Sequence, residues 1–166
     1  DILVAGSGTV LCAQEGPILA YGGLLRSTDG GQSWETVFHD EIITSVEICA
    51  ADPSIWYGAS WSALYRSEDA GDTWETYGDV ARGTWGPTGV TPGRPVDIQT
   101  DPADCDRIVI NNYTGGVFES YDGGQTVSMA TTGYTGAESY DLAVDPQDAS
   151  HVLAANTMAP FVSQDG

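Results

Sequence analysis

Apolar and polar residues alternate along short segments of this chain, and clusters of Gly, Pro, Asp and Ser separate the segments. The clearest set occupies residues 43–50, 55–60, 63–67 and 73–77. Comparable sets follow at 96–100, 107–112, 116–120 and 126–130, and then at 139–144, 151–156 and 160–163. Residues 17–27 and 33–38 form an earlier, less regular set, with 2–5 as a doubtful additional strand. Alternation with a period of two is typical of strands and no helical period is present, so the sequence predicts an all-β protein.

A turn-like pattern follows the third segment of each set and recurs four times along the chain. Its members are Ser27, Asp29, Gly31 and Trp34; Ser67, Asp69, Gly71 and Trp74; Ser120, Asp122 and Gly124; and Ser163 and Asp165. Ser and Asp side chains can bond to the amides of a tight turn, and glycine supplies the positive φ that the turn requires. A repeat of roughly 40–50 residues usually means one small sheet per repeat, so each copy is predicted to be a hairpin turn in one blade of an array.

A second repeated element is an Asp-Pro pair, which precedes each of the last three copies: Asp52-Pro53, Asp101-Pro102 and Asp145-Pro146. Proline cannot continue a central strand, so each pair predicts a turn between the first and second strands of its set. Alternate turns of a four-stranded antiparallel sheet lie at opposite ends. We therefore expect both kinds of turn on one common face of the molecule.

The repeated Ser-x-Asp-x-Gly pattern resembles the Asp-box, or BNR repeat, of a β-propeller superfamily. That superfamily includes sialidases, sortilin-type receptors, xyloglucan-hydrolysing endoglucanases and photosystem assembly propellers. The resemblance implies blades of four antiparallel strands at about residues 1–39, 40–79, 95–131 and 137–166, with a long inter-blade loop at 80–94. This amounts to an incomplete ring of about three and a half blades, so we expect the chain to be a piece of something longer. In this superfamily the repeated turn is structural and the ligand lies on the opposite face.

The charge balance is strongly acidic, with 24 acidic residues against 5 basic ones and a formal net charge of −19. Such a surface repels phosphate backbones and anionic membrane surfaces, which argues against nucleic-acid binding. No segment reaches the roughly 20 apolar residues of a membrane-spanning helix, so no membrane insertion is expected. We expect a secreted or cell-surface protein without a cofactor.

The three cysteines, Cys12, Cys49 and Cys105, form no CxxC pair, which argues against a zinc ribbon or an attached haem. Cys12 and Cys49 could pair if the blades bring them together, and the odd number leaves at least one thiol free or bonded elsewhere. Buried free cysteines are the favoured alternative. Asn112 begins a glycosylation sequon, a pattern that also arises by chance.

Three carboxylates lie on the predicted first strands of successive blades: Glu47, Asp97 and Asp141. The first strand is innermost in a propeller, so these side chains could supply a general acid and base or bind a cation. Inverting glycoside hydrolysis needs two carboxyls roughly 6.5–9.5 Å apart, with one kept protonated. By the resemblance to xyloglucanases, Asp97 is the nearest match to an aspartate that opens the first strand of a blade. The alternative interpretation is solvated rim charge or a carboxylate bonded to backbone.

The 80–94 loop is the best candidate for ligand contacts, because it is longer than a turn requires and carries Arg82, Trp85 and Arg94. An exposed indole can stack on a sugar ring or anchor a partner; alternatively, Trp85 is tucked under the loop. Trp61 and Tyr113 fall in strand two to strand three loops on the same face and are weaker candidates.

Two further groups of residues receive a structural interpretation. An oxygen-rich cluster is a weak calcium candidate, although its spacing favours a polar turn. A set of aromatic residues is interpreted as inter-blade core. The calcium candidates are Asp101, Asp104 and Asp106, and the aromatic set is Trp34, Trp56, Tyr57, Tyr65 and Trp74.

Two functional hypotheses remain open. The first is a non-catalytic extracellular module that binds a protein or a glycan, or builds an assembly, with the rest of the ring supplied by the same chain or by other subunits. The second is part of a glycoside hydrolase acting on a β-glucan such as xyloglucan. The resemblance to sialidases implies an Arg-Ile-Pro motif, and the five scattered arginines of this chain include none, which argues against sialidase chemistry.

Overall fold

The computed structural model describes residues 2–5, 9–14, 23–39, 41–78, 84–90, 92–113, 116–132, 139–156 and 159–164, which form strands and turns and no helix. Four sheets follow one another along the chain, and we refer to them as blades one to four. Blade one is β1 (Ile2–Ala5), β2 (Thr9–Gln14), β3 (Gly23–Ser27) and β4 (Glu35–His39). Blade two is β5 (Ser45–Ile48), β6 (Trp56–Ala59), β7 (Leu64–Ser67) and β8 (Glu75–Tyr77).

Blades three and four repeat the same order of strands. Blade three is β9 (Pro95–Asp101), β10 (Asp104–Asn112), β11 (Val117–Ser120) and β12 (Ser128–Met129). Blade four is β13 (Ser139–Asp145), β14 (Asp148–Asn156) and β15 (Phe161–Ser163). Every pair of neighbouring strands is antiparallel and strand order follows chain order, so each blade is a meander. The all-β prediction is confirmed. Strand β2 is an element that the sequence pattern missed.

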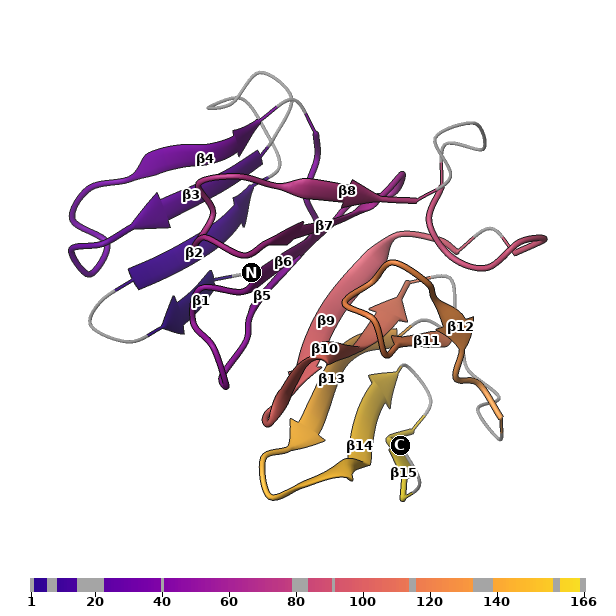
Figure 1. Ribbon diagram of the computed structural model, residues 1–166. Helices are drawn as coiled ribbons and strands as arrows, with labels where there is room; N and C mark the ends of the chain where they lie inside the picture. The colour runs from indigo at the N-terminus through magenta and orange to yellow at the C-terminus, as the bar shows by residue number, and fades with distance from the viewer. Residues whose placement is uncertain are drawn as a thin grey trace.

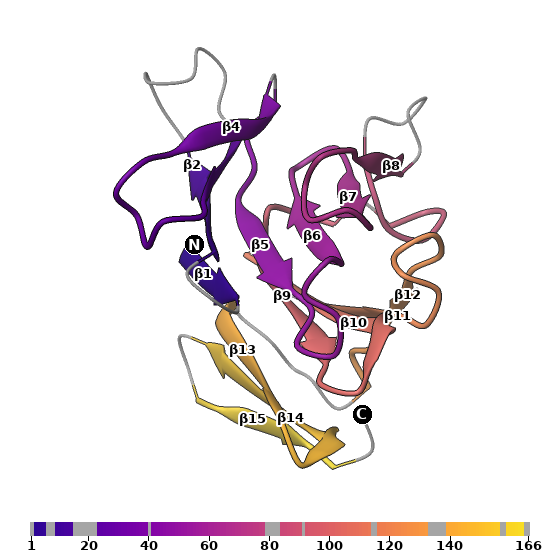
Figure 2. The same ribbon diagram turned by 60° about the vertical axis from the view of Figure 1, so that its left-hand side comes forward.

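The first strands lie on the inner side of the molecule, where successive blades meet. Strand β9 contacts both β5 and β13, and β1 contacts β5. Figures 1 and 2 show these strands gathered on the inner side, with β4, β8 and β12 toward the periphery. Side chains of an inner strand therefore point either to the preceding or to the following blade, because successive strand residues face opposite sides of a sheet.

Three apolar cores fill the seams between blades, one at each seam. Leu24 of β3 packs with Trp56 and Tyr65 at the seam of blades one and two. Tyr57 packs with Ile98 and Ile108 at the next seam. The remaining seam, between blades three and four, is filled by Val109, Val117, Leu142, Val152 and Ala154. Each core mixes residues of two blades, so neighbouring blades stabilise one another.

The predicted aromatic core needs one correction. Trp56, Tyr57 and Tyr65 are buried and Trp74 is partly buried, but 42% of Trp34 is exposed. The indole of Trp74 packs on Phe38 of the preceding blade, with ring centroids 5.8 Å apart. Trp34 holds the same position in blade one, and the described part of the chain supplies no blade ahead of it.

Each of the three repeated turns that the structure describes, at residues 27–34, 67–74 and 120–127, is closed by the same side-chain bonds. We call them the Ser-Asp turns. In the second, Ser67 Oγ accepts a bond from Gly71 N at 2.8 Å and donates one to Asp69 Oδ1 at 2.8 Å. Asp69 also accepts bonds from the amide and hydroxyl of Thr73 at 2.8 and 2.6 Å. The Thr73 hydroxyl, above all, holds the pKa of Asp69 down to about 2. Asp165, of the fourth copy, lies outside the described residues.

The Ser-Asp turns and the Asp-Pro turns lie at the same end of the blades, as their alternation along the strands requires. The amide of Ala70 donates to the carbonyl of Ser54, and that of Gly123 donates to the carbonyl of Asp106, both at 2.8 Å. We call this end the turn face and the opposite end the mouth face.

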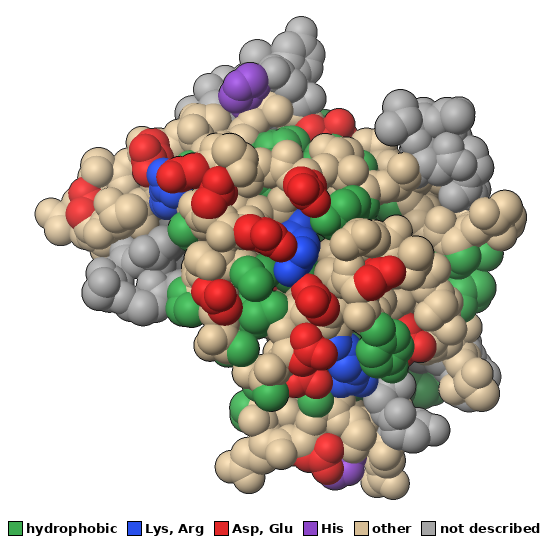
Figure 3. Space-filling model, viewed as in Figure 1, with side chains coloured by type: hydrophobic (Ala, Val, Ile, Leu, Met, Phe, Trp, Pro, Cys, Tyr) green, Lys and Arg blue, Asp and Glu red, His purple; other side chains and the backbone are tan. Residues whose placement is uncertain are grey.

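Three arginines connect neighbouring blades across the turn face. Arg26 bonds to Asp72 at 3.0 Å, Arg66 bonds to Asp106 at 2.7 Å, and Arg107 donates to the carbonyl of Ala149 at 2.6 Å. Each therefore reaches from one blade to the next. Figure 3 shows basic side chains set among acidic ones on the side in view. Most of the few cations of this acidic chain thus act as inter-blade contacts.

A disulfide between Cys49 and Cys105 joins blades two and three. The predicted alternatives, a Cys12–Cys49 pair or buried free thiols, are therefore wrong for Cys49 and Cys105. The pairing could not be predicted from the sequence. It depends on the contact between blades two and three, which brings the ends of these blades that carry the Asp-Pro turns close together. A disulfide fits an oxidising environment.

The described residues contain no helix long and apolar enough to cross a membrane.

Candidate functional site

Asp97 lies near the mouth-face end of inner strand β9, and its side chain points toward blade four. Its Oδ2 accepts a bond from the amide of Leu142 at 2.7 Å, and its Oδ1 accepts one from Gln99 Nε2 at 3.2 Å. Only 7% of the residue is exposed. The carboxyl is therefore held in the seam between blades three and four rather than in open solvent.

Burial is the main reason that the pKa of Asp97 rises to about 7, and the neighbouring carboxylate of Asp141 raises it further. The bonds from Leu142 and Gln99 act in the opposite direction, because they favour the charged form. Asp141 is exposed. The nearby carboxylate of Asp141 thus favours the protonated form of Asp97.

Glu47 makes the corresponding contact one seam earlier. Its Oε1 accepts bonds from the amide and the hydroxyl of Thr100, at 3.2 and 3.0 Å. Burial raises its pKa. Thr100 lies three residues beyond Asp97 along β9, toward the turn face, so Glu47 does not join the Asp97–Asp141 pair. The three inner-strand carboxylates form a pair and a separate single group rather than one ring.

The geometry of the pair limits its chemistry. Retaining and inverting glycosidases hold their two carboxyls at about 5–5.5 Å and about 6.5–9.5 Å, which leaves room for the sugar or a water. Asp97 already accepts two bonds from the protein, one of them from the amide of Leu142 in the next blade. This arrangement suits a contact that fastens two blades, and it leaves the outer carboxylate, Asp141, as the group available to a ligand.

One residue beside this pair was missed by sequence reasoning. Asn111 on β10 lies opposite Asp97 in the strand register and is fully buried. Its Nδ2 donates to the carbonyl of Asp141 at 3.5 Å, while its Oδ1 finds no hydrogen-bond partner among the described residues. The sequence did contain a signal that could have identified it, because the apolar run of this strand ends in two asparagines, Asn111 and Asn112.

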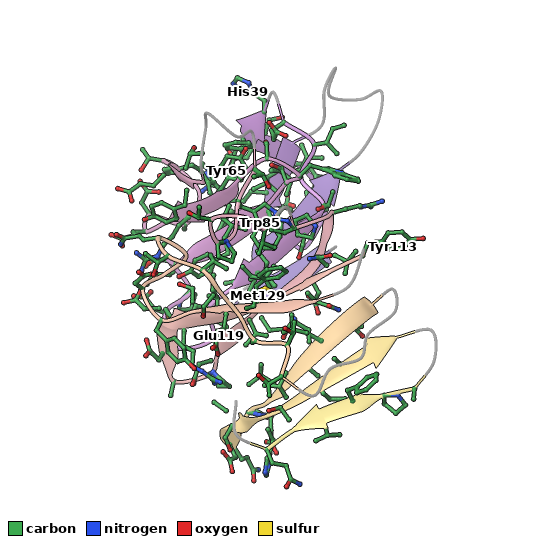
Figure 4. All side chains as sticks on the ribbon, turned by 90° about the vertical axis from the view of Figure 1, so that its right-hand side faces the viewer. His39, Tyr65, Trp85, Tyr113, Glu119 and Met129 are labelled. Carbon is green, nitrogen blue, oxygen red and sulfur yellow. A yellow bond between two sulfur atoms is a disulfide. The ribbon has the colours of Figure 1, made fainter. Side chains whose placement is uncertain are left out.

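Two aromatic side chains are exposed on the mouth face. Trp61, between β6 and β7, is 55% exposed, and Tyr113, just after β10, is 39% exposed. They occupy the same connection, between the second and third strands, in neighbouring blades. Tyr113 points away from the sheets in Figure 4. Its amide donates to the carbonyl of Arg94 at 2.8 Å, which fastens the end of the 84–94 segment to β10. Arg94 is half-buried, and Arg82 lies outside the described residues.

Trp85 corrects the expectation of an exposed indole. It is 1% exposed and packs edge-on against Phe118, with ring centroids 5.1 Å apart. Figure 4 shows it among the sheets. The loop returns over the seam of blades two and three and buries its largest apolar side chain there, which is the alternative that the sequence left open.

The calcium interpretation is not supported by the residues present. Asp101 accepts a bond from Ala103 N at 2.9 Å, Asp104 accepts one from Asp106 N at 3.0 Å, and Asp106 pairs with Arg66. The described residues contain no group of three or more acidic, His or Cys side chains that could hold a metal ion. Polar turns account for this cluster. Asn112 of the sequon is fully buried in the folded chain.

No protein-family model matches the sequence, and no curated protein matches it. Solved structures do resemble the fold. An ancestral GH74 enzyme aligns over 99% of this chain at 15% identity with a TM-score of 0.73, and the GH74 enzyme of Niastella koreensis aligns over 99% at 16% with a TM-score of 0.71. YCF48 bound to a D1 peptide aligns over 95% at 14% identity with a TM-score of 0.59.

This chain has a β-propeller fold. At such low identities the likeness shows the fold alone. The alignments cover 22% and 28% of the two GH74 chains and 52% of the YCF48 chain, so this chain spans about a quarter to a half of the propeller proteins that it resembles.

Proposed function

We propose that this chain is a non-catalytic, extracellular β-propeller module that binds a neutral glycan on its mouth face. The observation that carries the proposal is the pair of exposed aromatic side chains, Trp61 and Tyr113, at equivalent connections of adjacent blades. The Ser-Asp turns are the Asp-boxes of this module. The Ser and Asp side chains of these turns make hydrogen bonds within the turn itself, on the face opposite the mouth face, which supports a structural role for them.

The chemistry of the mouth face favours a sugar without charge. Aromatic rings offer flat apolar surface to the C–H face of a pyranose, and an exposed carboxylate such as Asp141 can accept bonds from hydroxyls. A net charge of −19 repels sialylated, sulfated or phosphorylated ligands. Two structural neighbours are GH74 enzymes, and the repeated turns resemble those of xyloglucan-hydrolysing endoglucanases, which makes xyloglucan and related β-glucans the first ligands to test.

Calorimetric titration with xyloglucan oligosaccharides tests the proposal. We expect saturable binding that weakens by about ten-fold or more in Trp61→Ala and in Tyr113→Ala, because exposed aromatic anchors dominate such contacts. Tyr121→Ala is the matched control, since Tyr121 is 63% exposed and belongs to a Ser-Asp turn on the other face. Normal binding in both mouth-face variants, or no binding of any neutral β-glucan, would contradict the proposal.

Glycoside hydrolysis is the second candidate, and the raised pKa of Asp97 beside Asp141 favours it. A carboxyl that is protonated near neutral pH can act as a general acid. Reducing-sugar release from xyloglucan separates the two functions. Turnover that disappears in Asp97→Asn while oligosaccharide binding persists would establish catalysis and exclude the non-catalytic part of our proposal.

A further inference from the structure

The connection between β6 and β7 is a tight hairpin on the mouth face, and Trp61 and Ser62 are the two residues at its tip. The amide of Ser60 donates to the carbonyl of Ala63 at 2.9 Å, which closes the turn. The Ser60 hydroxyl is fully buried and accepts bonds from the amides of Ser62 and Ala63, both at 3.1 Å. We call this hairpin the blade-two tip. Because these bonds fix its backbone, its side chains are held in place before a ligand arrives.

The segment that enters blade two, residues 41–44, lies alongside this tip. The amide of Thr44 donates to the carbonyl of Ala59 at 2.8 Å. Three residues earlier, Oε1 of Glu41 accepts a bond from the hydroxyl of Ser62 at 3.2 Å. Since one contact lies three residues before Thr44 and three residues after Ala59, the two segments are antiparallel and keep one register.

That register places an apolar pair next to the polar one. Ile42 lies opposite Trp61, and the two residues directly adjoin Glu41 and Ser62 in the chain. Ile42 is 45% exposed and Trp61 is 55% exposed, so both offer apolar surface to the solvent. The blade-two tip therefore combines an aromatic surface with a carboxylate and a hydroxyl, as sites that bind sugars must.

The polar pair is suited to accept hydrogen bonds from a ligand. The carboxylate of Glu41 is an acceptor only, and among the described residues its Oε2 takes part in no hydrogen bond. The Ser62 hydroxyl donates its proton to Oε1 and keeps its lone pairs as acceptors. Both residues are partly exposed. Such a group of acceptors fits a ligand that presents two neighbouring donors, and a neutral sugar does so with vicinal hydroxyls.

We propose that Glu41, held by Ser62, determines which sugar binds at Trp61, by selecting a pyranose whose two vicinal hydroxyls are both equatorial. This inference rests on the mouth-face glycan proposal and adds the polar contacts that give one of its two anchors selectivity. A ring that stacks on the indole holds its equatorial hydroxyls in the plane of the ring, so a carboxylate beside the indole can accept from two of them. An axial hydroxyl points out of that plane and loses the contact, which leaves the carboxylate without one of its donors.

Two epimeric oligosaccharides test the inference by calorimetric titration of the 166-residue chain. Cellohexaose has equatorial hydroxyls at carbons 2 and 3 of each inner ring, and mannohexaose differs only in its axial hydroxyl at carbon 2. We expect the parent chain to bind cellohexaose about ten-fold or more tightly than mannohexaose. Glu41→Gln should weaken binding of cellohexaose by about ten-fold and change binding of mannohexaose little, because the amide keeps the size of the side chain and loses its charge.

Two further variants separate selectivity from stacking and from net charge. Trp61→Ala should weaken the binding of both sugars, since stacking does not depend on the hydroxyl at carbon 2. Glu68→Gln removes the same charge from the turn face, where the side chain of Glu68 is 69% exposed, and should leave both affinities unchanged. Equal melting temperatures of Glu41→Gln and the parent confirm that the tip is intact.

The outcomes distinguish this inference from the proposed function. If Trp61→Ala weakens binding while Glu41→Gln leaves the preference for cellohexaose intact, the inference is wrong and the mouth-face proposal stands. Equal affinity of the parent chain for the two sugars also overturns the inference. Failure of both sugars to bind overturns it as well, and the titration with xyloglucan oligosaccharides then decides whether the mouth-face proposal fails with it.

Discussion

The carboxyl of Asp97 accepts a hydrogen bond of 2.7 Å from the backbone amide of Leu142, and this bond joins the inner strands of two neighbouring blades. Glu47 makes the same kind of bond to the amide of Thr100 one seam earlier. A buried carboxylate that accepts bonds from backbone of the next blade stabilises the seam directly, since the amide would otherwise lose its partner. The inner carboxylates are thus part of the scaffold, and the mouth face is built around them.

The stability of the protein should depend on the ionisation of Asp97. Its pKa in the folded chain is about 7, far above the usual value of about 3.9 in an unfolded chain, so the folded state retains a proton that the unfolded state has lost between these values. The free energy of unfolding should therefore decrease as the pH rises from about 4 to about 7, by at most about 1.4 kcal/mol per pH unit. Urea unfolding at several pH values measures this slope.

Asp97→Asn removes the titration while its amide oxygen can still accept the bond from Leu142. We expect a flatter dependence of stability on pH between about 4 and 7 than in the parent chain. Ser128→Ala, on the exposed strand β12, removes no ionisable group; it is the control and should leave the slope unchanged. An Asp97→Asn profile parallel to that of the parent would show that Asp97 ionises normally.

The Ser-Asp turns should contribute to stability through their serines. Ser67 is 1% exposed, and its hydroxyl is the acceptor for the amide of Gly71. Ser67→Ala leaves that amide without its partner and should lower the free energy of unfolding by about 1–3 kcal/mol. Ser128→Ala on β12 changes an exposed serine and should have little effect. Chemical denaturation gives both values. If the Ser67→Ala chain were as stable as the parent chain, the hydroxyl of Ser67 would not contribute to the stability of the turn.

Acid should weaken the same turns over a different range of pH. The pKa values of Asp29 and Asp69 are each held at about 2, chiefly by the hydroxyls of Ser33 and Thr73. A lowered pKa in the folded state contributes stability that is present above the unfolded value of about 3.9 and is lost as the pH falls toward 2. Melting temperatures between pH 4 and pH 2 should therefore fall. Replacing both Asp29 and Asp69 by Asn should make the melting temperature less dependent on pH in this range. If the melting temperature of that variant fell as steeply as that of the parent, other groups would be responsible.

The sequence could predict the all-β fold, because strand alternation and the repeated turns are local signals. Burial between blades was harder to predict. Trp34 and Trp74 occupy equivalent positions in the repeat, yet among the described residues only Trp74 has a preceding blade to pack against. Trp85 lies in a Gly- and Pro-rich loop that resembles an exposed one, and its burial depends on the loop returning over a seam. The partners of Asp97 and Cys49 belong to other blades, so no local pattern contains them.

The disulfide between Cys49 and Cys105 should be a large single contribution to stability. It spans 56 residues of chain and fastens blade two to blade three, so it restricts the unfolded state as well as the seam. Replacing both cysteines by Ser should lower the free energy of unfolding by about 2–5 kcal/mol. Cys12→Ser alone is the control. A melting temperature that does not respond to a reducing agent would contradict this assignment.

Two glycines in equivalent turns should respond differently to the same substitution. Gly71 and Gly30 both have positive φ, +90° and +75°, so an alanine at either site is strained by about 1–2 kcal/mol. An added Cβ at Gly71 would lie 2.6 Å from Cζ3 of Trp56, a buried side chain of the core between blades one and two, whereas at Gly30 it would meet nothing within 4 Å. Gly71→Ala should therefore cost about 1–3 kcal/mol more than Gly30→Ala, since the indole has no room to move. Equal losses in denaturation would mean that the turn of blade two does not close over Trp56, and that backbone conformation alone explains the glycines of these turns.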